Sequence, residues 1–345
     1  MKIYEERRLK LTENLSGDIA VIIPGSVLAN RSNDTAYPFR QDSNFYYLSG
    51  FNEPDSTLMI ISKSGKTNSI GFVPKKDKLK EIWDGFRYGP DGMKSDFGFN
   101  DAFNNDEIDE LLPDLLDGVS CVYYPFGKVD GFDQKVIKWT KKANSKDRHS
   151  KKMEIADISK VIGNKRLIKD SSEIDIIEKA CKISANAHLE AMKFVKPGMN
   201  ESEVEAFYLY EFAKNGGRFP AYNPIVASGE NACVLHYVEN NQVINDGDLL
   251  LVDAGCEYDM YASDITRTFP ANGKFSDEQL QIYNIVLEAQ KASVDAVRKG
   301  NGVMDPQTIS EKVITEGLID LGIIKGNLEE EHEKGSFKDF YMHKI

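Results

Sequence analysis

The sequence has little positive charge for its size. It carries 43 lysine and arginine residues against 55 aspartate and glutamate residues, so its formal net charge is -12. Nucleic acids are bound by basic surfaces that neutralise phosphates, and this balance therefore argues against a nucleic-acid partner. The one basic cluster covers residues 138–152, a polar stretch more typical of a solvated face or a linker.

Long apolar runs and closely spaced cysteines are absent as well. No segment approaches the roughly 18 uninterrupted apolar residues of a membrane-spanning helix. The N-terminal residues mix charged and apolar side chains and lack the apolar core of a secretory signal. The four cysteines form no CxxC pair, a spacing that fits neither a zinc finger nor a disulfide framework. We therefore expect a cytoplasmic protein with no membrane partner.

A chain of 345 residues is long enough for two domains. The first, over residues 1–150, is expected to be an α/β domain, because short β-branched or aromatic runs alternate with helical and turn segments. A helix is predicted over residues 106–116, broken near Pro113. The clearest strands are predicted at residues 19–25, 56–62 and 119–126.

The second domain, over residues 165–345, opens with helical periodicity. Apolar residues recur every three or four positions from Ile174 to Val195, so one side of a long helix should face a core. His188 falls on this apolar stripe, and we interpret it as a buried structural histidine rather than a metal ligand. Capping boxes are predicted to open three helices of this domain: Ser172 with Asp175, Asn200 with Glu203, and Ser276 with Gln279.

The pair of helices occurs twice. Gly198 and Gly300 follow the first helix of each pair, about 100 residues apart, as Gly217 and Gly322 follow the second. This repeat indicates an α+β domain built from two halves related by pseudo-two-fold symmetry. The second half is shorter than the first, and only the start of one strand is predicted for it, at residues 339–345. We expect this half to be incomplete.

Two aspartates are the most informative residues of the second domain. Asp253 ends an apolar strand run, and Asp264 lies in the next run, over residues 260–269. If the turn between them is centred between Tyr258 and Asp259, the two carboxylates lie opposite one another on a hairpin. Like charges placed across strands repel, and partly buried ones also lose hydration, so a cationic partner is expected.

Spacing alone leaves three interpretations of this pair open. Both aspartates could be exposed turn acids, although apolar strand residues flank them. They could form a structural network with Arg267, which follows Asp264 by three positions. They could instead bind a divalent metal ion through hard oxygen ligands, as Mn²⁺ and similar ions prefer.

Several long runs resemble one family. They are SGENACVLHYVENN at residues 228–241, the aspartate-containing run from residue 246, and DFYMHK at residues 339–344. These resemble the catalytic domain of Xaa-Pro aminopeptidases (aminopeptidase P), which has the pita-bread fold. Residues 31–56 resemble the N-terminal domain of the same family. The likeness covers essentially the whole chain.

The resemblance implies a site with two manganese ions held by two aspartates, one histidine and two glutamates. Asp253 and Asp264 match the two aspartates and are the expected metal ligands. His236 and His343 match active-site histidines and are the expected catalytic residues, as donors to the peptide carbonyl or oxyanion. Three aromatic residues could line a pocket for proline or belong to the core: Phe219, Tyr222 and Tyr237.

The family removes the N-terminal residue from peptides with proline in second position, and its members often form homodimers or homotetramers. The other three metal ligands are not found in this sequence. His332 lies in a charged run, residues 329–333, that is predicted to be a solvated loop and not their source. We therefore expect the chain to be inactive and poorly stable by itself.

Two alternatives to this function remain. Prolidase shares the metal site but accepts only Xaa-Pro dipeptides. A non-catalytic pita-bread module that binds a peptide or another protein would also explain the missing ligands.

Overall fold

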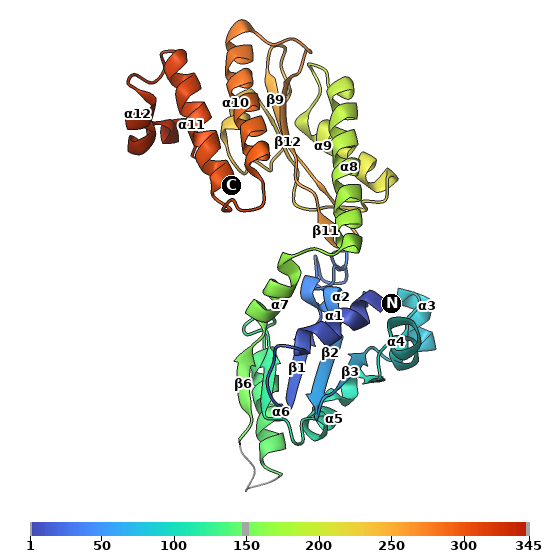
Figure 1. The fold of residues 1–345 in the computed structure, drawn as a ribbon. Coiled ribbons are helices and arrows are strands. Elements are labelled where there is room, and N and C mark those ends of the chain that lie inside the picture. Colours follow the sequence, from blue (N-terminus) through green and yellow to red (C-terminus); the bar gives the residue numbers. More distant parts are fainter. Residues whose placement is uncertain (1, 147–151, 343–345) are drawn as a thin grey trace. The chain divides into compact units, whose positions relative to one another are not determined.

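The computed structural model describes residues 2–146 and 152–342, which form two compact units, Met1–Ile174 and Asp175–Ile345 (Figure 1). Residues 151–164, which the domain prediction assigned to neither domain, fall in the first unit. No helix of the described ranges is long and apolar enough to cross a lipid bilayer.

The first unit is built on one mixed sheet with the strand order β4-β3-β2-β1-β5-β6. The central strand β1 runs antiparallel to β2 and parallel to β5. The strands are β1 (Ile19–Pro24), β2 (Thr57–Lys63), β3 (Lys66–Val73), β4 (Asp101–Asn104), β5 (Cys121–Tyr124) and β6 (Glu154–Asp157). The helices are α1 (Lys2–Thr12), α2 (Ser43–Ser49), α3 (Lys78–Asp84), α4 (Gly89–Phe97), α5 (Ile108–Leu115), α6 (Phe132–Asn144) and α7 (Ser159–Leu167).

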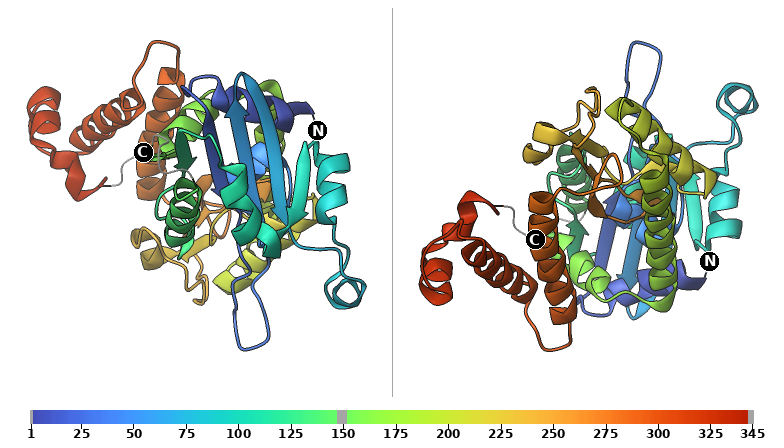
Figure 2. Two further views of the ribbon diagram at one scale, coloured as in Figure 1. Left: turned by 90° about the horizontal axis from the view of Figure 1, so that it is seen from below. Right: turned by 90° about the horizontal axis from the view of Figure 1, so that it is seen from above.

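Helices cover both faces of this sheet (Figure 2). Successive residues of β1 alternate between two buried clusters, because side chains along a strand point to opposite faces. Val21 packs with residues of α1, α2, α4 and α7, whereas Ile22 packs with residues of α5 and α6. Burial on both faces explains why the run IAVIIP is continuously apolar.

The three strands predicted for this unit are confirmed as β1, β2 and β5. The predicted break near Pro113 is wrong, because α5 continues through Pro113 to Leu115. Within the described residues, the basic cluster begins in a helix and not in a linker. Its first residues form the end of α6, where Trp139 is buried and donates a 2.7 Å hydrogen bond to Asp109.

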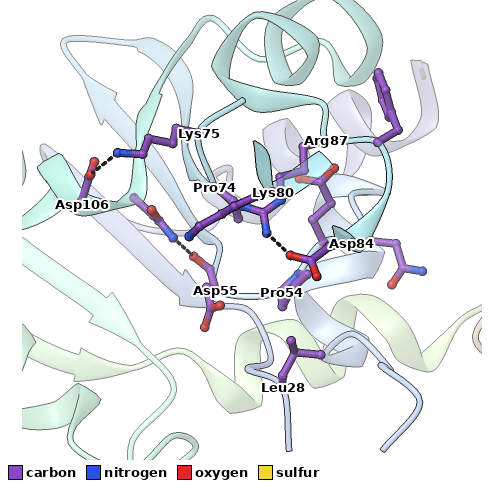
Figure 3. Close-up of a pocket in the computed structure, with 13 residues that line it drawn as sticks. Leu28, Pro54, Asp55, Pro74, Lys75, Lys80, Asp84, Arg87 and Asp106 are labelled. Atoms are coloured by element: carbon purple, nitrogen blue, oxygen red, sulfur yellow. Dashed lines mark hydrogen bonds and ion pairs between the residues drawn. The ribbon is translucent and has the colours of Figure 1, made fainter. Parts of the chain in front are cut away.

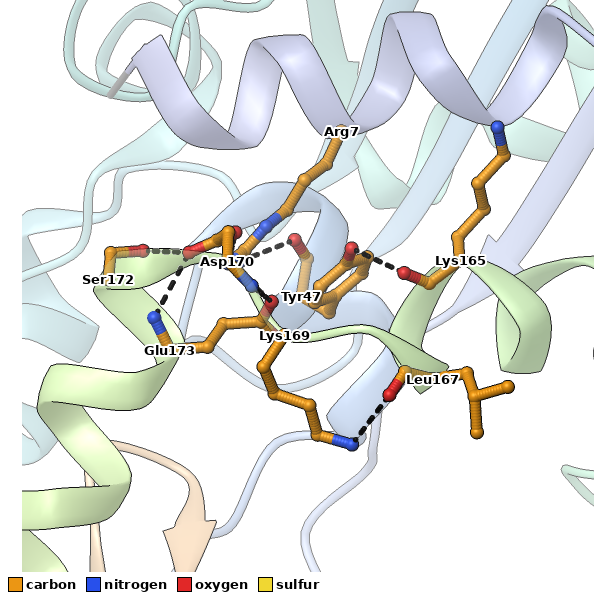
Figure 4. A network of polar contacts seen from close by, with 8 residues as sticks. All are labelled: Arg7, Tyr47, Lys165, Leu167, Lys169, Asp170, Ser172 and Glu173. Atoms are coloured by element: carbon orange, nitrogen blue, oxygen red, sulfur yellow. Dashed lines mark hydrogen bonds and ion pairs between the residues drawn. The ribbon is translucent and has the colours of Figure 1, made fainter. Parts of the chain in front are cut away.

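A polar network fixes the start of α8 (Ser171–Phe194), as Figure 4 shows. Asp170 Oδ1 accepts hydrogen bonds from the Glu173 N–H at 3.0 Å and the Ser172 hydroxyl at 2.6 Å, while the Asp170 N–H donates to Glu173. Arg7 forms a 2.9 Å ion pair with the same carboxylate. The predicted box of Ser172 with Asp175 is therefore wrong, because Asp170 and Glu173 form the cap two residues earlier.

The second unit joins helices to two three-stranded sheets, ordered β11-β10-β7 and β12-β9-β8. Its strands are β7 (Phe219–Pro220), β8 (Ile225–Ser228), β9 (Leu249–Asp253), β10 (Cys256–Tyr258), β11 (Tyr261–Ala262) and β12 (Thr266–Pro270). After α8, its helices are α9 (Glu201–Lys214), α10 (Asp277–Ala296), α11 (Asp305–Asp320) and α12 (Leu328–Lys334).

The helix pairs of the repeat are present as α8 with α9 and α10 with α11 (Figure 1). The capping boxes of Asn200 with Glu203 and of Ser276 with Gln279 are both confirmed. The first pair contributes Ala187, Tyr208 and neighbouring residues to a core that includes β8, β9 and β12. This core includes residues of β9, which ends at Asp253, and of β12, which begins two residues after Asp264.

Two expectations for the last residues are wrong within the described part of the chain. Asp339 belongs to a 3-10 helix (Ser336–Asp339) and does not start a strand. His332 lies on α12 and not in a solvated loop, since its ring stacks on Phe337 at 5.7 Å between centroids.

Candidate metal centre

The hairpin that carries the two aspartates has a register different from the predicted one. Asp253 pairs across the sheet with Thr266, and Tyr258 pairs with Tyr261. The turn is therefore centred one residue later than expected, and Asp264 lies diagonally from Asp253 and not opposite it. A shift of two positions in the pairing keeps a side chain on the same face of the sheet, so both carboxylates still lie on one face.

The turn itself explains the shift. Asp259 and Met260 both have positive φ values, 46° and 70°, as the two central residues of a type I′ hairpin turn require. Just before it, the backbones of the two strands approach closely. A Cβ atom on Gly255 would lie 1.9 Å from the carbonyl oxygen of Ser263. Only glycine fits this position, next to Asp264.

Tyr222 joins the two carboxylates. Its hydroxyl donates a hydrogen bond to Asp253 Oδ1 and lies 3.1 Å from Asp264 Oδ1. Burial, together with the hydrogen bond to Asp253 and the charges of both aspartates, raises the pKa of Tyr222 well above its usual range. Tyr222 is therefore neutral at physiological pH and brings a proton to two negative groups.

Arg267 does not neutralise the pair. Its Nη1 donates at 2.7 Å to the carbonyl oxygen of Thr266, and in residues 2–146 and 152–342 no lysine or arginine forms an ion pair with Asp253 or Asp264. The interpretation as a network with Arg267 is therefore wrong. No third histidine, cysteine, aspartate or glutamate of the same ranges joins the two carboxylates in a metal-binding group.

His188 supports the bend that follows Asp253. It is buried, and its Nε2 lies 3.2 Å from the carbonyl oxygen of Ala254 while its Nδ1 lies 2.9 Å from the Tyr208 hydroxyl. Burial lowers the pKa of His188 and opposes its protonation. A neutral ring can donate from Nε2 to Ala254 and accept from Tyr208 at Nδ1. The interpretation of His188 as a core histidine is confirmed.

Of the two histidines expected in the site, the structure describes only His236. It is exposed in the irregular stretch between β8 and β9, next to the buried Tyr237. His343 lies outside the described residues. Tyr237 is a core residue, since its ring packs with Ile225 and Ala227.

A pocket in the first unit is lined by charges of both signs (Figure 3). Its volume is about 710 Å³, and lysine, arginine and aspartate side chains line it. Several of these charges pair with one another, since Arg87 lies 3.1 Å from Asp84 and Lys75 lies 3.7 Å from Asp106. The pair of aspartates in the second unit, where like charges meet, is the stronger candidate for a cation site.

The sequence did not reveal the part that Tyr222 plays. The sequence leaves Tyr222 as either a pocket wall or a core residue, whereas its hydroxyl is the group that contacts both carboxylates. The buried Glu201, which contacts several residues around His236, was not predicted as a functional residue at all. Neither contact has a local sequence signal, because each joins residues more than 30 positions apart.

Both units of the chain match known protein families. Residues 175–345 match metallopeptidase family M24, and residues 4–123 match the aminopeptidase P N-terminal domain. The Xaa-Pro aminopeptidase of Haemophilus influenzae is 39% identical over 342 residues, which are 99% of this chain and 77% of that protein. The Xaa-Pro aminopeptidase of Escherichia coli is 38% identical and is covered to 78%.

Solved structures agree in fold. The Pseudomonas aeruginosa aminopeptidase PepP matches with a TM-score of 0.95 and 40% identity, over 99% of this chain and 77% of that one. A zinc-substituted Escherichia coli aminopeptidase P in complex with product matches with a TM-score of 0.96 and 38% identity, over 99% and 78%. The chain thus spans about three quarters of the length of these relatives.

Proposed function

The chain belongs to the Xaa-Pro aminopeptidases of metallopeptidase family M24, a family of hydrolases that act with a divalent metal ion, and we propose that it removes the N-terminal residue from peptides whose second residue is proline. One observation carries the proposal in this molecule. The carboxylates of Asp253 and Asp264 meet at the Tyr222 hydroxyl on one hairpin, with no cationic side chain of the described ranges paired to them.

The residues present fit part of a divalent metal site. Carboxylate oxygens are hard ligands, and two carboxylates that share one hydroxyl retain further lone pairs for an ion. We propose that Asp253 and Asp264 hold manganese, as two ions when the full ligand set is assembled. The bound ions would activate water and polarise the scissile carbonyl.

The chain's own residues have separable roles in this proposal. Asp253 and Asp264 supply negative charge from a rigid hairpin that the close approach at Gly255 fixes. His236 is exposed and would donate a hydrogen bond to the peptide carbonyl or the developing oxyanion. His343 is proposed for the same task. An Xaa-Pro bond offers no N–H to an enzyme, so contacts to its carbonyl must orient it.

Asp253 and Asp264 are the only proposed metal ligands among the described residues. We therefore propose that the 345-residue chain by itself binds Mn²⁺ weakly and has little or no activity, because water would complete most of the shell of each ion. We also propose that the protein acts in the cytoplasm and assembles as a homodimer or homotetramer.

Kinetics with the Mn²⁺-loaded enzyme tests the function. An Xaa-Pro-Xaa tripeptide should be cleaved after its first residue, and Asp253→Asn should lower kcat/KM by at least about a hundredfold. Cleavage of Xaa-Pro dipeptides alone would show a prolidase instead. Binding of peptides without any cleavage even when Mn²⁺ saturates the site would show a non-catalytic module.

A further inference from the structure

One buried carboxylate organises the segment that carries His236. Residues 228–242, here called the His236 loop, begin at Ser228, the last residue of β8, and continue through a short 3-10 helix (Gly229–Cys233). The remaining residues, 234–242, belong to neither a helix nor a strand. A loop without regular hydrogen bonds needs other partners for its backbone groups if it is to hold one conformation. Glu201, the first residue of α9, provides them.

Both ends of the His236 loop are tied to Glu201. Its Oε1 accepts from the Ser228 N–H at 2.8 Å, and its Oε2 accepts from the Gln242 N–H at 3.0 Å. The Glu201 N–H in turn donates to the Gln242 carbonyl at 2.9 Å. The side chain and the backbone of Glu201 therefore hold the two ends of the loop together.

The interior of the loop is tied to the same carboxylate. Oε1 also accepts from the Ser228 hydroxyl at 2.7 Å and from the Asn231 amide at 3.1 Å. Oε2 accepts from the Tyr237 hydroxyl at 2.7 Å. Glu201 is 0% exposed, so five donors satisfy a fully buried charge. Hydrogen bonds to a charged acceptor are stronger than neutral ones, and several together fix a geometry.

The hydrogen bond to Tyr237 connects this arrangement to His236. The Tyr237 ring is buried against Ile225 and its hydroxyl is held by Glu201, whereas His236, the preceding residue, is exposed. Asn240 anchors the loop on the other side, through 2.9 Å hydrogen bonds with the Val226 N–H and the Pro224 carbonyl. The backbone that carries His236 is thus held by buried contacts on both sides of that residue.

We propose that Glu201 is a positioning residue for His236: its buried carboxylate holds the His236 loop in one conformation, through Tyr237, and thereby sets where the His236 imidazole meets the substrate. The proposal rests on the proposed role of His236. It goes beyond that role because it assigns a task to a residue that lies in the core and touches neither the aspartates nor the substrate.

The charge of Glu201 is the property to test. In Glu201→Gln the shape of the side chain is kept, but one oxygen becomes an amide nitrogen that donates and cannot accept. Either Ser228 and Asn231, or Tyr237 and Gln242, then lose their acceptor. Histidine-selective isotope labelling of the 345-residue chain reports on the loop directly by NMR. The protein has five histidines, so the His236 signal is assigned as the one that His236→Ala removes.

We expect the His236 ring signal to shift or broaden in Glu201→Gln and to move less, in the same direction, in Tyr237→Phe, which removes one of the five donors. Glu173→Gln is the matched control, because Glu173 is an equally buried carboxylate at the start of α8. Unchanged His236 signals in Glu201→Gln would overturn the proposal. So would an equal change in the Glu173→Gln control.

If Glu201→Gln does not fold, Tyr237→Phe decides alone, since phenylalanine keeps the buried ring and removes only the hydroxyl. In the Mn²⁺-loaded enzyme, Tyr237→Phe should lower kcat by roughly threefold to tenfold with a smaller change in KM. A change in KM alone would contradict positioning. Full activity of His236→Ala would sink the proposed role of His236 and leave the NMR result for Glu201 standing, so the two failures are distinguishable.

Discussion

The hydroxyl of Tyr222 lies 3.1 Å from Oδ1 of Asp264 while it donates to Asp253. One proton therefore lies near two negative groups, of which Asp253 ends β9 and Asp264 lies between β11 and β12. A hydroxyl between carboxylates reduces their repulsion, but it cannot cancel two charges. The negative charge that remains on the two carboxylates suits the binding of a divalent ion.

Removing the Tyr222 hydroxyl should lower the stability of the protein, and a bound metal ion should restore that stability. We expect Tyr222→Phe to lower the free energy of unfolding of the metal-free chain by about 1–2 kcal/mol, because both carboxylates lose their donor. Saturating Mn²⁺ should recover most of this loss, since the ion takes over as their partner. Urea unfolding with and without Mn²⁺ measures both.

The matched control is Tyr210→Phe, which removes a hydroxyl from the exposed side of α9. It should change stability by less than about 0.5 kcal/mol and show no dependence on Mn²⁺ beyond that of the wild type. An equal stability of Tyr222→Phe and wild type without metal would show that the hydroxyl does not support the carboxylates.

The close approach at Gly255 makes the hairpin sensitive to a single methyl group. A Cβ here would meet the Ser263 carbonyl at 1.9 Å, so Gly255→Ala should destabilise the chain by roughly 3 kcal/mol or more. Gly163→Ala is the control, because no heavy atom lies within 4 Å of the corresponding Cβ on α7 and alanine favours a helix. Gly255→Ala should therefore lower the melting temperature, and Gly163→Ala should raise it. Equal melting temperatures would contradict the register described for the hairpin.

Glu201 should contribute stability that depends on pH. Burial alone would raise its pKa, but the hydrogen bonds from Ser228, Gln242 and Tyr237 outweigh burial and hold the pKa below its usual value. A carboxyl with a lowered pKa in the folded state stabilises the fold above its unfolded pKa, near 4.3, and loses this contribution as the pH falls through the folded value.

Glu201→Gln isolates this contribution because glutamine does not titrate. The wild type should be more stable than the variant by about 2 kcal/mol at neutral pH, and the difference should shrink as the pH falls below about 4. Denaturant unfolding of both proteins across this range measures the difference. A constant difference from neutral to acidic pH would contradict a lowered pKa at Glu201.

The parts of the fold that local chemistry determines were predictable. The Asn200 and Ser276 caps follow from a side chain and a glutamate or glutamine three positions later. The same rule failed at Ser172, because Asp170 is also a good cap and Arg7, distant in the sequence, pairs with it. A tertiary contact decided between two locally acceptable caps.

The candidate site was predictable only in part, for a similar reason. Asp253 and Asp264 stand out by sequence, but their register depends on positive φ values at Asp259 and Met260, and methionine gives no signal for such a turn. The roles of Tyr222 and Glu201 depend on contacts across more than 30 positions. Periodicity and spacing contain no information on such contacts.

Mn²⁺ binding followed by electron paramagnetic resonance tests the central claim most directly, because ions that bind lose the sharp signal of the hydrated ion. We expect the 345-residue chain to bind Mn²⁺ weakly but measurably, and we expect Asp253→Asn combined with Asp264→Asn to remove this binding. Asp91→Asn combined with Asp96→Asn, on the surface of α4, should bind as the wild type does. Equal Mn²⁺ binding by the wild type and the Asp253→Asn, Asp264→Asn variant would contradict a metal centre on this hairpin.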